Sequence, residues 1–207
     1  MRNLIRRQLL LMRAVWVSVF WVGACLTAGT AAWGQGAPPA KPDVSSLDVA
    51  VTYDTMLSNV TAGTHFWMQG GSIQVHGQFW RGLGVVADVA GLHTGNINNS
   101  GVGLDLVTVT FGPRYTWSLA HSRYSVFGQA LVGEGLGMNS TFPASSSAVS
   151  AATSLATQLG GGVNLSLSHQ FALRAIEASW VRSQIPNATD DVQNSMRLGA
   201  GMVFRLP

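Results

Sequence analysis

Residues 196–206 read MRLGAGMVFRL, and apolar side chains occupy every second position of this stretch. Most of the positions between them hold arginine or glycine. Because successive side chains of a β-strand point to opposite faces of the sheet, this pattern predicts a strand with one apolar face and one face that carries charge.

The same alternation recurs along most of the chain, in residues 47–54, 73–79, 107–117 and 155–167. Three further segments bring the number of expected strands to eight: 83–91, 124–137 and 171–182. Short connections near 81–82, 118–122 and 168–170 alternate strictly with longer ones that are rich in Asn, Ser, Thr and Gly, at 58–69, 93–103, 139–152 and 184–194. In an antiparallel up-and-down order, all short turns then lie at one end of the sheet and all long loops at the other.

The two faces of these strands predict what surrounds the sheet. We expect the apolar faces of the seven strands with a readable phase to carry no Asp, Glu, Lys or Arg. The alternate faces carry seven ionisable residues, which are too many for the core of a water-soluble barrel: Asp48, Asp54, His76, Asp88, Arg114, Arg197 and Arg205. Lipid outside and a polar lumen inside remove this conflict, and a closed barrel pairs every backbone hydrogen-bonding group within a bilayer. The expected fold is therefore all-β, an eight-stranded antiparallel up-and-down transmembrane β-barrel over residues 47–207.

The distribution of aromatic residues supports this orientation. Seven of the 14 aromatic residues after Gly34 lie near the short connections or the C-terminus: Phe79, Trp80, Tyr115, Trp117, Tyr124, Phe171 and Phe204. Aromatic side chains gather where a membrane meets water. We therefore expect the short turns to lie at one membrane surface.

The N-terminal segment predicts export. Four arginines in the first 13 residues precede an apolar stretch of 13 residues at 14–26, which has the size of a signal-peptide core. We expect a signal peptide over residues 1–34, cleaved before Gln35, and a flexible periplasmic tether over 35–46. An alternative treats residues 22–25 as a lipobox, with Cys25 lipidated. After residue 34 the chain holds eight basic and nine acidic residues, a net charge of −1, so no nucleic-acid partner is expected.

Several segments resemble the small bacterial outer-membrane β-barrel proteins of the OmpA/OmpX type, in the stand-alone form without a periplasmic domain. They include LGVVADVAGLHTG at 83–95, TFGPRYTW at 110–117 and RLGAGMVFRL at 197–206. The resemblance implies a location in the bacterial outer membrane and contact with its lipid or lipopolysaccharide and with the assembly machinery. It also implies a role in envelope integrity or in surface binding through four extracellular loops, with a ligand that the sequence does not identify.

We expect the lumen charges, together with Glu177, to form a charge-balanced structural plug, because an eight-stranded barrel is just wide enough for side chains to fill it. Glycines at 160, 162, 199 and 201 would leave room for the arginines. A narrow diffusion channel is the alternative. Arg174 and Glu177 differ in parity, so either a β-bulge separates them or Arg174 reaches toward the periplasmic interface; the second interpretation is favoured.

Catalysis is not expected. The five histidines form no His-x-Ser pair and have no metal-ligand spacing, so neither a catalytic site, a metal site nor a cofactor is predicted. A lipid-modifying outer-membrane enzyme remains a second alternative. Phe66, Trp67 and Phe142 are apolar residues in two of the expected loops, where they pack on the barrel rim or contact a partner.

Overall fold

The structure is a computed structural model, and it describes residues 47–59, 65–119, 123–142, 149–185 and 192–206. The expected signal peptide, the alternative lipidation at Cys25 and the expected tether lie outside these residues. Among the described residues, no helix is long and apolar enough to cross a membrane.

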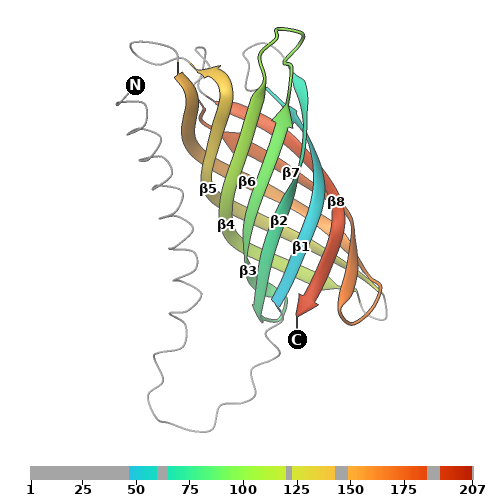
Figure 1. Cartoon of the computed structure of the whole chain (residues 1–207). Helices are drawn as coiled ribbons and strands as arrows, with labels where there is room; N and C mark the ends of the chain where they lie inside the picture. The colour runs from blue at the N-terminus through green and yellow to red at the C-terminus, as the bar shows by residue number, and fades with distance from the viewer. Residues whose placement is uncertain (1–46, 60–64, 120–122, 143–148, 186–191, 207) are drawn as a thin grey trace, which may run out of the picture. The chain divides into compact units, whose positions relative to one another are not determined.

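Eight antiparallel strands follow one another in chain order and close into a barrel, with β8 paired to β1 (Figure 1). This confirms the expected fold. The strands are β1 (Leu47–Ser58), β2 (Phe66–Trp80), β3 (Leu83–Thr94), β4 (Leu104–Ser118), β5 (Tyr124–Phe142), β6 (Val149–Ser166), β7 (Phe171–Ser183) and β8 (Gln193–Leu206).

The connections sort to two ends, as expected. We call the end with the connections 81–82, 119–123 and 167–170 the turn end, and the opposite end the loop end. Arg81 and Gly82 both have positive φ angles, of 35° and 89°. Two consecutive residues of this kind form the hairpin turn whose twist matches that of the flanking strands.

All four loops are shorter than expected because the strands beside them are longer, and the difference is largest for the first and third loops. β2 already begins at Phe66, and β5 extends to Phe142. Phe66 and Met68 are both buried and continue the period-two pattern of β2. The polar residues in this part of the sequence were therefore not sufficient to indicate a loop.

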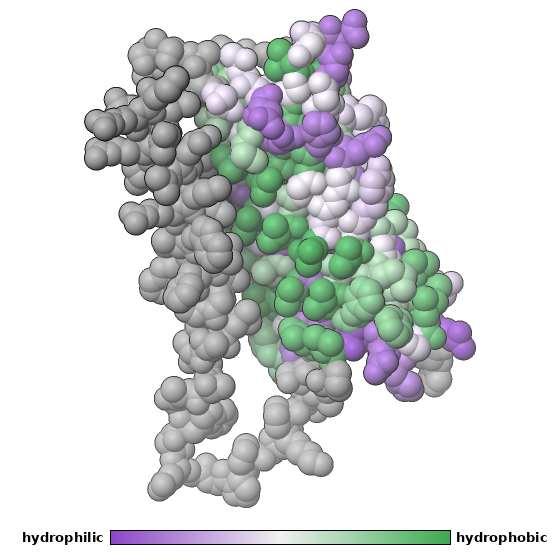
Figure 2. All heavy atoms as spheres, in the orientation of Figure 1, coloured by the Kyte–Doolittle hydropathy of each residue, from purple (hydrophilic) through white to green (hydrophobic). Residues whose placement is uncertain are grey.

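The outer surface of the barrel is apolar and the inner surface is polar. Outward-facing side chains such as Ile73 and Leu159 are 54% and 59% exposed, whereas the inward-facing Asp88 and Arg197 are buried. Figure 2 shows hydrophobic residues gathered in a band on the visible face, with hydrophilic residues toward both ends. Because an exposed apolar band of this extent is unfavourable in water, the described strands form a membrane-spanning barrel.

The aromatic residues expected near the turn end face outward. Phe79, Trp80, Trp117, Tyr124 and Phe171 are all exposed. Edge-to-face contacts join Tyr115 to Trp117, with ring centroids 4.5 Å apart, and Phe171 to Phe204 at 5.6 Å. These rings form an aromatic girdle at the turn end.

One expectation about the outer face was wrong. Glu134 of β5 points outward and is exposed, between Val109 of β4 and Leu155 of β6. Its parity with Val132 and Leu136 places it on the apolar face, so the expected absence of charge there does not hold. The cost of an outward carboxylate falls toward the membrane surface, and the long β5 allows such a position.

Substitutions on one strand test the depth of the apolar band. Leu159→Arg places a charge on the lipid side of β6 between Ala130 and Trp180, and we expect it to lower the free energy of unfolding by about 2–4 kcal/mol. Thr153→Arg, at an exposed outward position nearer the loop end of β6, should cost about 0–1 kcal/mol. Denaturant unfolding of the refolded barrel in detergent measures both, and equal costs would contradict the assigned band.

Candidate functional site in the barrel lumen

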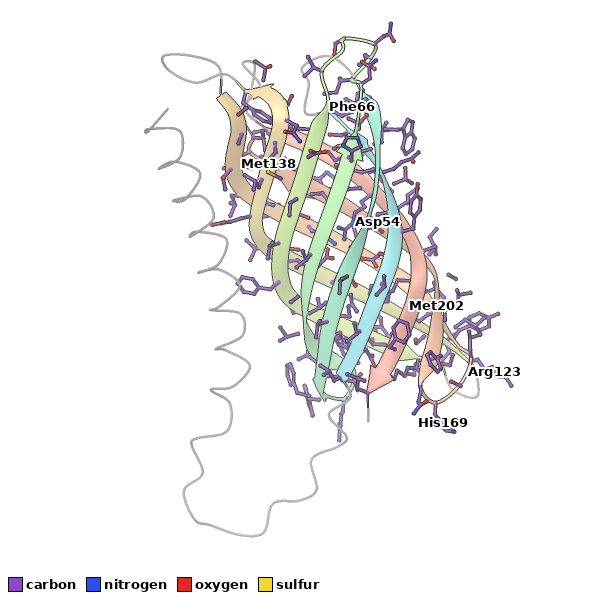
Figure 3. The ribbon with its side chains drawn as sticks, in the orientation of Figure 1. Asp54, Phe66, Arg123, Met138, His169 and Met202 are labelled. Atoms are coloured by element: carbon purple, nitrogen blue, oxygen red, sulfur yellow. The ribbon has the colours of Figure 1, made fainter. Side chains whose placement is uncertain are left out.

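The lumen has three layers, which we call the loop-end apolar cluster, the central charged network and the turn-end cavity. Figure 3 shows Phe66 near the loop end, Asp54 at mid-height, and Arg123 with His169 at the turn end. Each layer is built from inward-facing positions of several strands. Every lumen residue expected from the sequence lies in the central charged network or in the turn-end cavity.

Arg197 of β8 is the cation at the centre of the network. Its Nη2 donates to Asp88 Oδ2 at 2.6 Å, and Asp54 Oδ2 and Glu177 Oε1 each lie 3.9 Å from its guanidinium. All four side chains are almost completely buried. The three carboxylates come from β1, β3 and β7, so this cluster connects strands that are not neighbours in the barrel wall.

Glu177 connects this cluster to a second pair of cations. Its carboxylate accepts hydrogen bonds from Gln74 Nε2 at 2.7 Å, Gln129 Nε2 at 3.1 Å and Arg174 Nη1 at 2.7 Å. Arg114 donates from Nε to Gln129 Oε1 at 2.9 Å and also contacts Gln74. The two glutamines therefore bridge the acidic and basic members of the network.

A β-bulge in β7 brings Arg174 and Glu177 to the same side. Arg174 pairs with Gly201 and Glu177 with Gly199, so β7 has one extra residue here, and Ala175 and Ile176 both face outward. The favoured interpretation, in which Arg174 reaches toward the interface, was wrong. Inside the lumen its guanidinium gains Glu177, Gln74 and Asn164 as partners, which lipid does not offer.

Phe127 of β5 is the aromatic residue of this network. The guanidinium carbons of Arg114 and Arg174 lie 4.3 Å and 4.7 Å from its ring centroid. Both distances are within the range of a cation–π interaction, which stabilises charge that is removed from water.

The glycines make room for groups other than arginine. A Cβ at Gly199 would lie 2.2 Å from Asp54 Oδ1, and one at Gly162 would lie 2.9 Å from the Phe127 ring. At Gly160 and Gly201 the nearest atoms belong to Ser179 and to the backbone of Val51. The nearest atoms at these four glycines therefore belong to other groups than the arginines.

The turn-end cavity contains the remaining expected lumen residues. Asp48, His76 and Arg205 line a polar cavity of about 250 Å³ together with Arg114 and Arg174. His76 Nδ1 lies 3.5 Å from Asp48 Oδ2, and Arg205 Nη2 donates to Ser166 Oγ at 2.9 Å. The cavity lies between the central network and the turn-end rim.

Apolar side chains close the loop end of the lumen. This cluster is built from five consecutive strands, β1 to β5, and from two loop-end connections: Met56, Phe66, Met68, Leu92, Leu104, Leu106, Phe142, Ile97 and Ile185. The amide side chain of Gln193 fixes Ile185 by accepting from its N at 2.8 Å and donating to its O at 2.6 Å. The apolar cluster thus fills the loop end beside buried polar side chains of β1, β7 and β8: Ser58, Ser183, Gln193 and Ser195.

The three expected loop-contact residues separate into two groups. Phe66 and Phe142 lie in strands and are buried in the loop-end apolar cluster, so their expected placement in loops was wrong, whereas their burial agrees with packing on the barrel. Trp67, which follows Phe66, points outward and is 56% exposed. Alternation within β2 sends the two neighbours to opposite faces.

Sequence reasoning missed several members of the network: Arg174 as a lumen residue, Gln74, Gln129 and Phe127. Gln74 is on the polar face of its strand, and Phe127 is opposite in phase to Tyr124 and Val126, so parity was the available signal. Among the described residues, no group of three or more His, Cys, Asp or Glu side chains is placed to hold a metal ion.

This geometry defines a class of protein: a membrane-spanning, eight-stranded barrel with a side-chain-filled, charged lumen. Neither a protein-family model nor a curated protein sequence matches the chain. Its fold is similar to that of Ail, the attachment invasion locus protein of Yersinia pestis, with a TM-score of 0.53 and 18% identity over 78% of this chain and 99% of that one. It is also similar to Neisserial surface protein A, with a TM-score of 0.60 and 12% identity over 79% of this chain and 100% of that one. The outer membrane protein OprG from Pseudomonas aeruginosa matches with a TM-score of 0.50 and 9% identity over 78% of this chain and 96% of that one. The chain therefore has the fold of small bacterial outer-membrane barrels.

Removal of the central cation tests the network. Arg197→Met leaves Asp88, Asp54 and Glu177 without this partner, and we expect the free energy of unfolding to fall by about 3–5 kcal/mol. Arg182→Gln, at an exposed outward position of β7, is the matched control and should change it by no more than about 0.5 kcal/mol. Denaturant unfolding in detergent compares the two variants, and similar losses would argue against a network centred on Arg197.

Deletion of one residue tests the bulge. Without Ala175, Arg174 and Glu177 would alternate with Ile176 in a regular strand and both would still face the lumen. We expect this variant to refold and to migrate faster unheated than boiled on a denaturing gel. Deletion of Ala178, outside the bulge, forces a lumen side chain toward lipid and should prevent refolding. The opposite outcome would show that the extra residue lies elsewhere.

Proposed function

We propose that the chain is an integral protein of the bacterial outer membrane that serves envelope integrity or surface binding, and neither bulk transport nor catalysis. The turn end would lie in the periplasm and the loop end outside the cell. This orientation is supported by the aromatic girdle and the tight turns at one end, which are typical of the periplasmic side of such barrels.

The closed lumen is the observation that carries this proposal. The loop-end apolar cluster blocks one end, and the central charged network crosses the middle with side chains that hydrogen-bond to one another. A continuous water path would require both layers to separate. Transport by diffusion is therefore the less favoured function.

The outer surface at the loop end supports contact with lipopolysaccharide. Near the exposed Trp67, Tyr53 of β1 donates to Gln69 of β2. Polar contacts also join β3, β4 and β5, because Asp105 contacts both His93 and Asn139. An exposed Trp next to polar groups suits the boundary between hydrocarbon and headgroups. The name of Ail, an attachment invasion locus protein, agrees with a role at the cell surface.

Electrical recording tests the proposal. Protein purified from the outer-membrane fraction of expressing cells is reconstituted into planar bilayers, and the heat-dependent gel shift shows that it is folded. We expect no discrete conductance steps, because the apolar cluster and the network close the lumen. Regular steps from the folded protein would favour a narrow channel, and absence of the protein from the outer-membrane fraction would contradict the proposed location.

A further inference from the structure

The turn-end cavity has an unusual concentration of guanidinium groups. Arginines from β4, β7 and β8 and from the connection before β5 line it: Arg114, Arg174, Arg205 and Arg123. Arg114 and Arg174 are buried at the inner end of the cavity, and Arg123 is exposed at the turn end (Figure 3). The cavity therefore leads from the rim to buried cations.

The acidic groups around this cavity do not balance its arginines. Arg174 forms an ion pair with Glu177, whereas Arg114 donates to glutamines and Arg205 to Ser166. Within the described residues, neither Arg123 nor Arg205 forms an ion pair, and Asp48 is the single carboxylate in the cavity lining. The lining thus carries an excess of positive charge.

Two buried polar atoms of the lining also lack partners. Within the described part of the chain, His76 Nε2 and Asp48 Oδ1 form no hydrogen bond. Buried polar groups are normally satisfied by protein, water or a ligand. An imidazole Nε2 that carries a proton can donate to an oxyanion, whereas the Asp48 oxygen accepts only and needs a donor such as water. Because the barrel wall and the surrounding lipid have a low dielectric constant, the unbalanced positive charge acts strongly on an anion at the rim.

We propose that the turn-end cavity binds a phosphate group. A guanidinium presents its N–H donors in a planar fork that matches phosphate oxygens, and four arginines, three from strands and one from a connection, line this cavity. The volume of about 250 Å³ is smaller than the roughly 300–1,000 Å³ of pockets for drug-sized ligands, which favours a compact oxyanion. This site lies at the end opposite to the loops and is additional to the surface role proposed above.

Calorimetric titration of the refolded mature barrel with inorganic phosphate, in a zwitterionic detergent and chloride buffer, tests this inference. We expect saturable binding that weakens about tenfold in Arg205→Gln and again in Arg123→Gln, since each removes one charge-assisted hydrogen bond. Arg182→Gln, an arginine substitution on the outer surface of β7, should bind phosphate as the unmodified protein does. A parallel titration with glycerol 3-phosphate distinguishes the source, because tighter binding of the ester assigns the site to a phosphate carried by a larger molecule.

The rim variants keep the test decisive if buried substitutions prevent folding. Arg114→Gln should abolish binding when it refolds, as judged by the heat-dependent gel shift; when it does not, Arg205→Gln and Arg123→Gln provide the answer. Absence of saturable binding to the folded unmodified protein would overturn the proposal. Equal affinity in the rim variants and the unmodified protein would overturn it too.

Discussion

The absence of hydrogen-bonding partners in lipid governs this structure. Backbone N–H and C=O groups in a bilayer must pair within the protein, and an open sheet would leave two edges unpaired. Pairing of β1 with β8 removes both edges. Closure with eight strands then leaves an interior so narrow that the polar side chains on the inner face contact one another, which is why Arg197, Asp88 and Glu177 meet although they lie far apart in the sequence.

Strand number, closure and the direction of most side chains were predictable from the sequence, because period-two alternation maps directly onto the two faces of a barrel. The bulge at Ala175 and Ile176 was not, since parity alone does not distinguish an extra residue from a side chain that bends toward the interface. The outward position of Glu134 was missed because Val132 and Leu136, on the same face of β5, are apolar and gave that face its assignment. Phe66 and Phe142 were wrongly placed in loops. The sequence analysis expected polar side chains on the inner face of the barrel, but near the loop end the inner face also carries an apolar cluster that contains both residues.

The partners of each lumen residue could not be read from the sequence. Gln74 of β2 contacts Glu177 and Arg174 of β7 across the barrel, and no local pattern encodes a contact between strands that are not adjacent. Such contacts depend on strand register and tilt, which the turns and the bulge determine. The division of the lumen into apolar, charged and cavity layers follows from these contacts.

The seam between β1 and β8 has a consequence for biogenesis. All other strand pairs join neighbours in sequence, so seven of the eight pairings form from local hairpins, whereas the seam must bring the two ends of the domain together. Ordering so long a segment has a large entropic cost before any contact compensates it. Hydrogen bonds across the lumen, such as that between Arg197 and Asp88, can form only after the sheet has curved enough to bring β8 and β3 together. They therefore stabilise the closed barrel after the β1–β8 seam has paired.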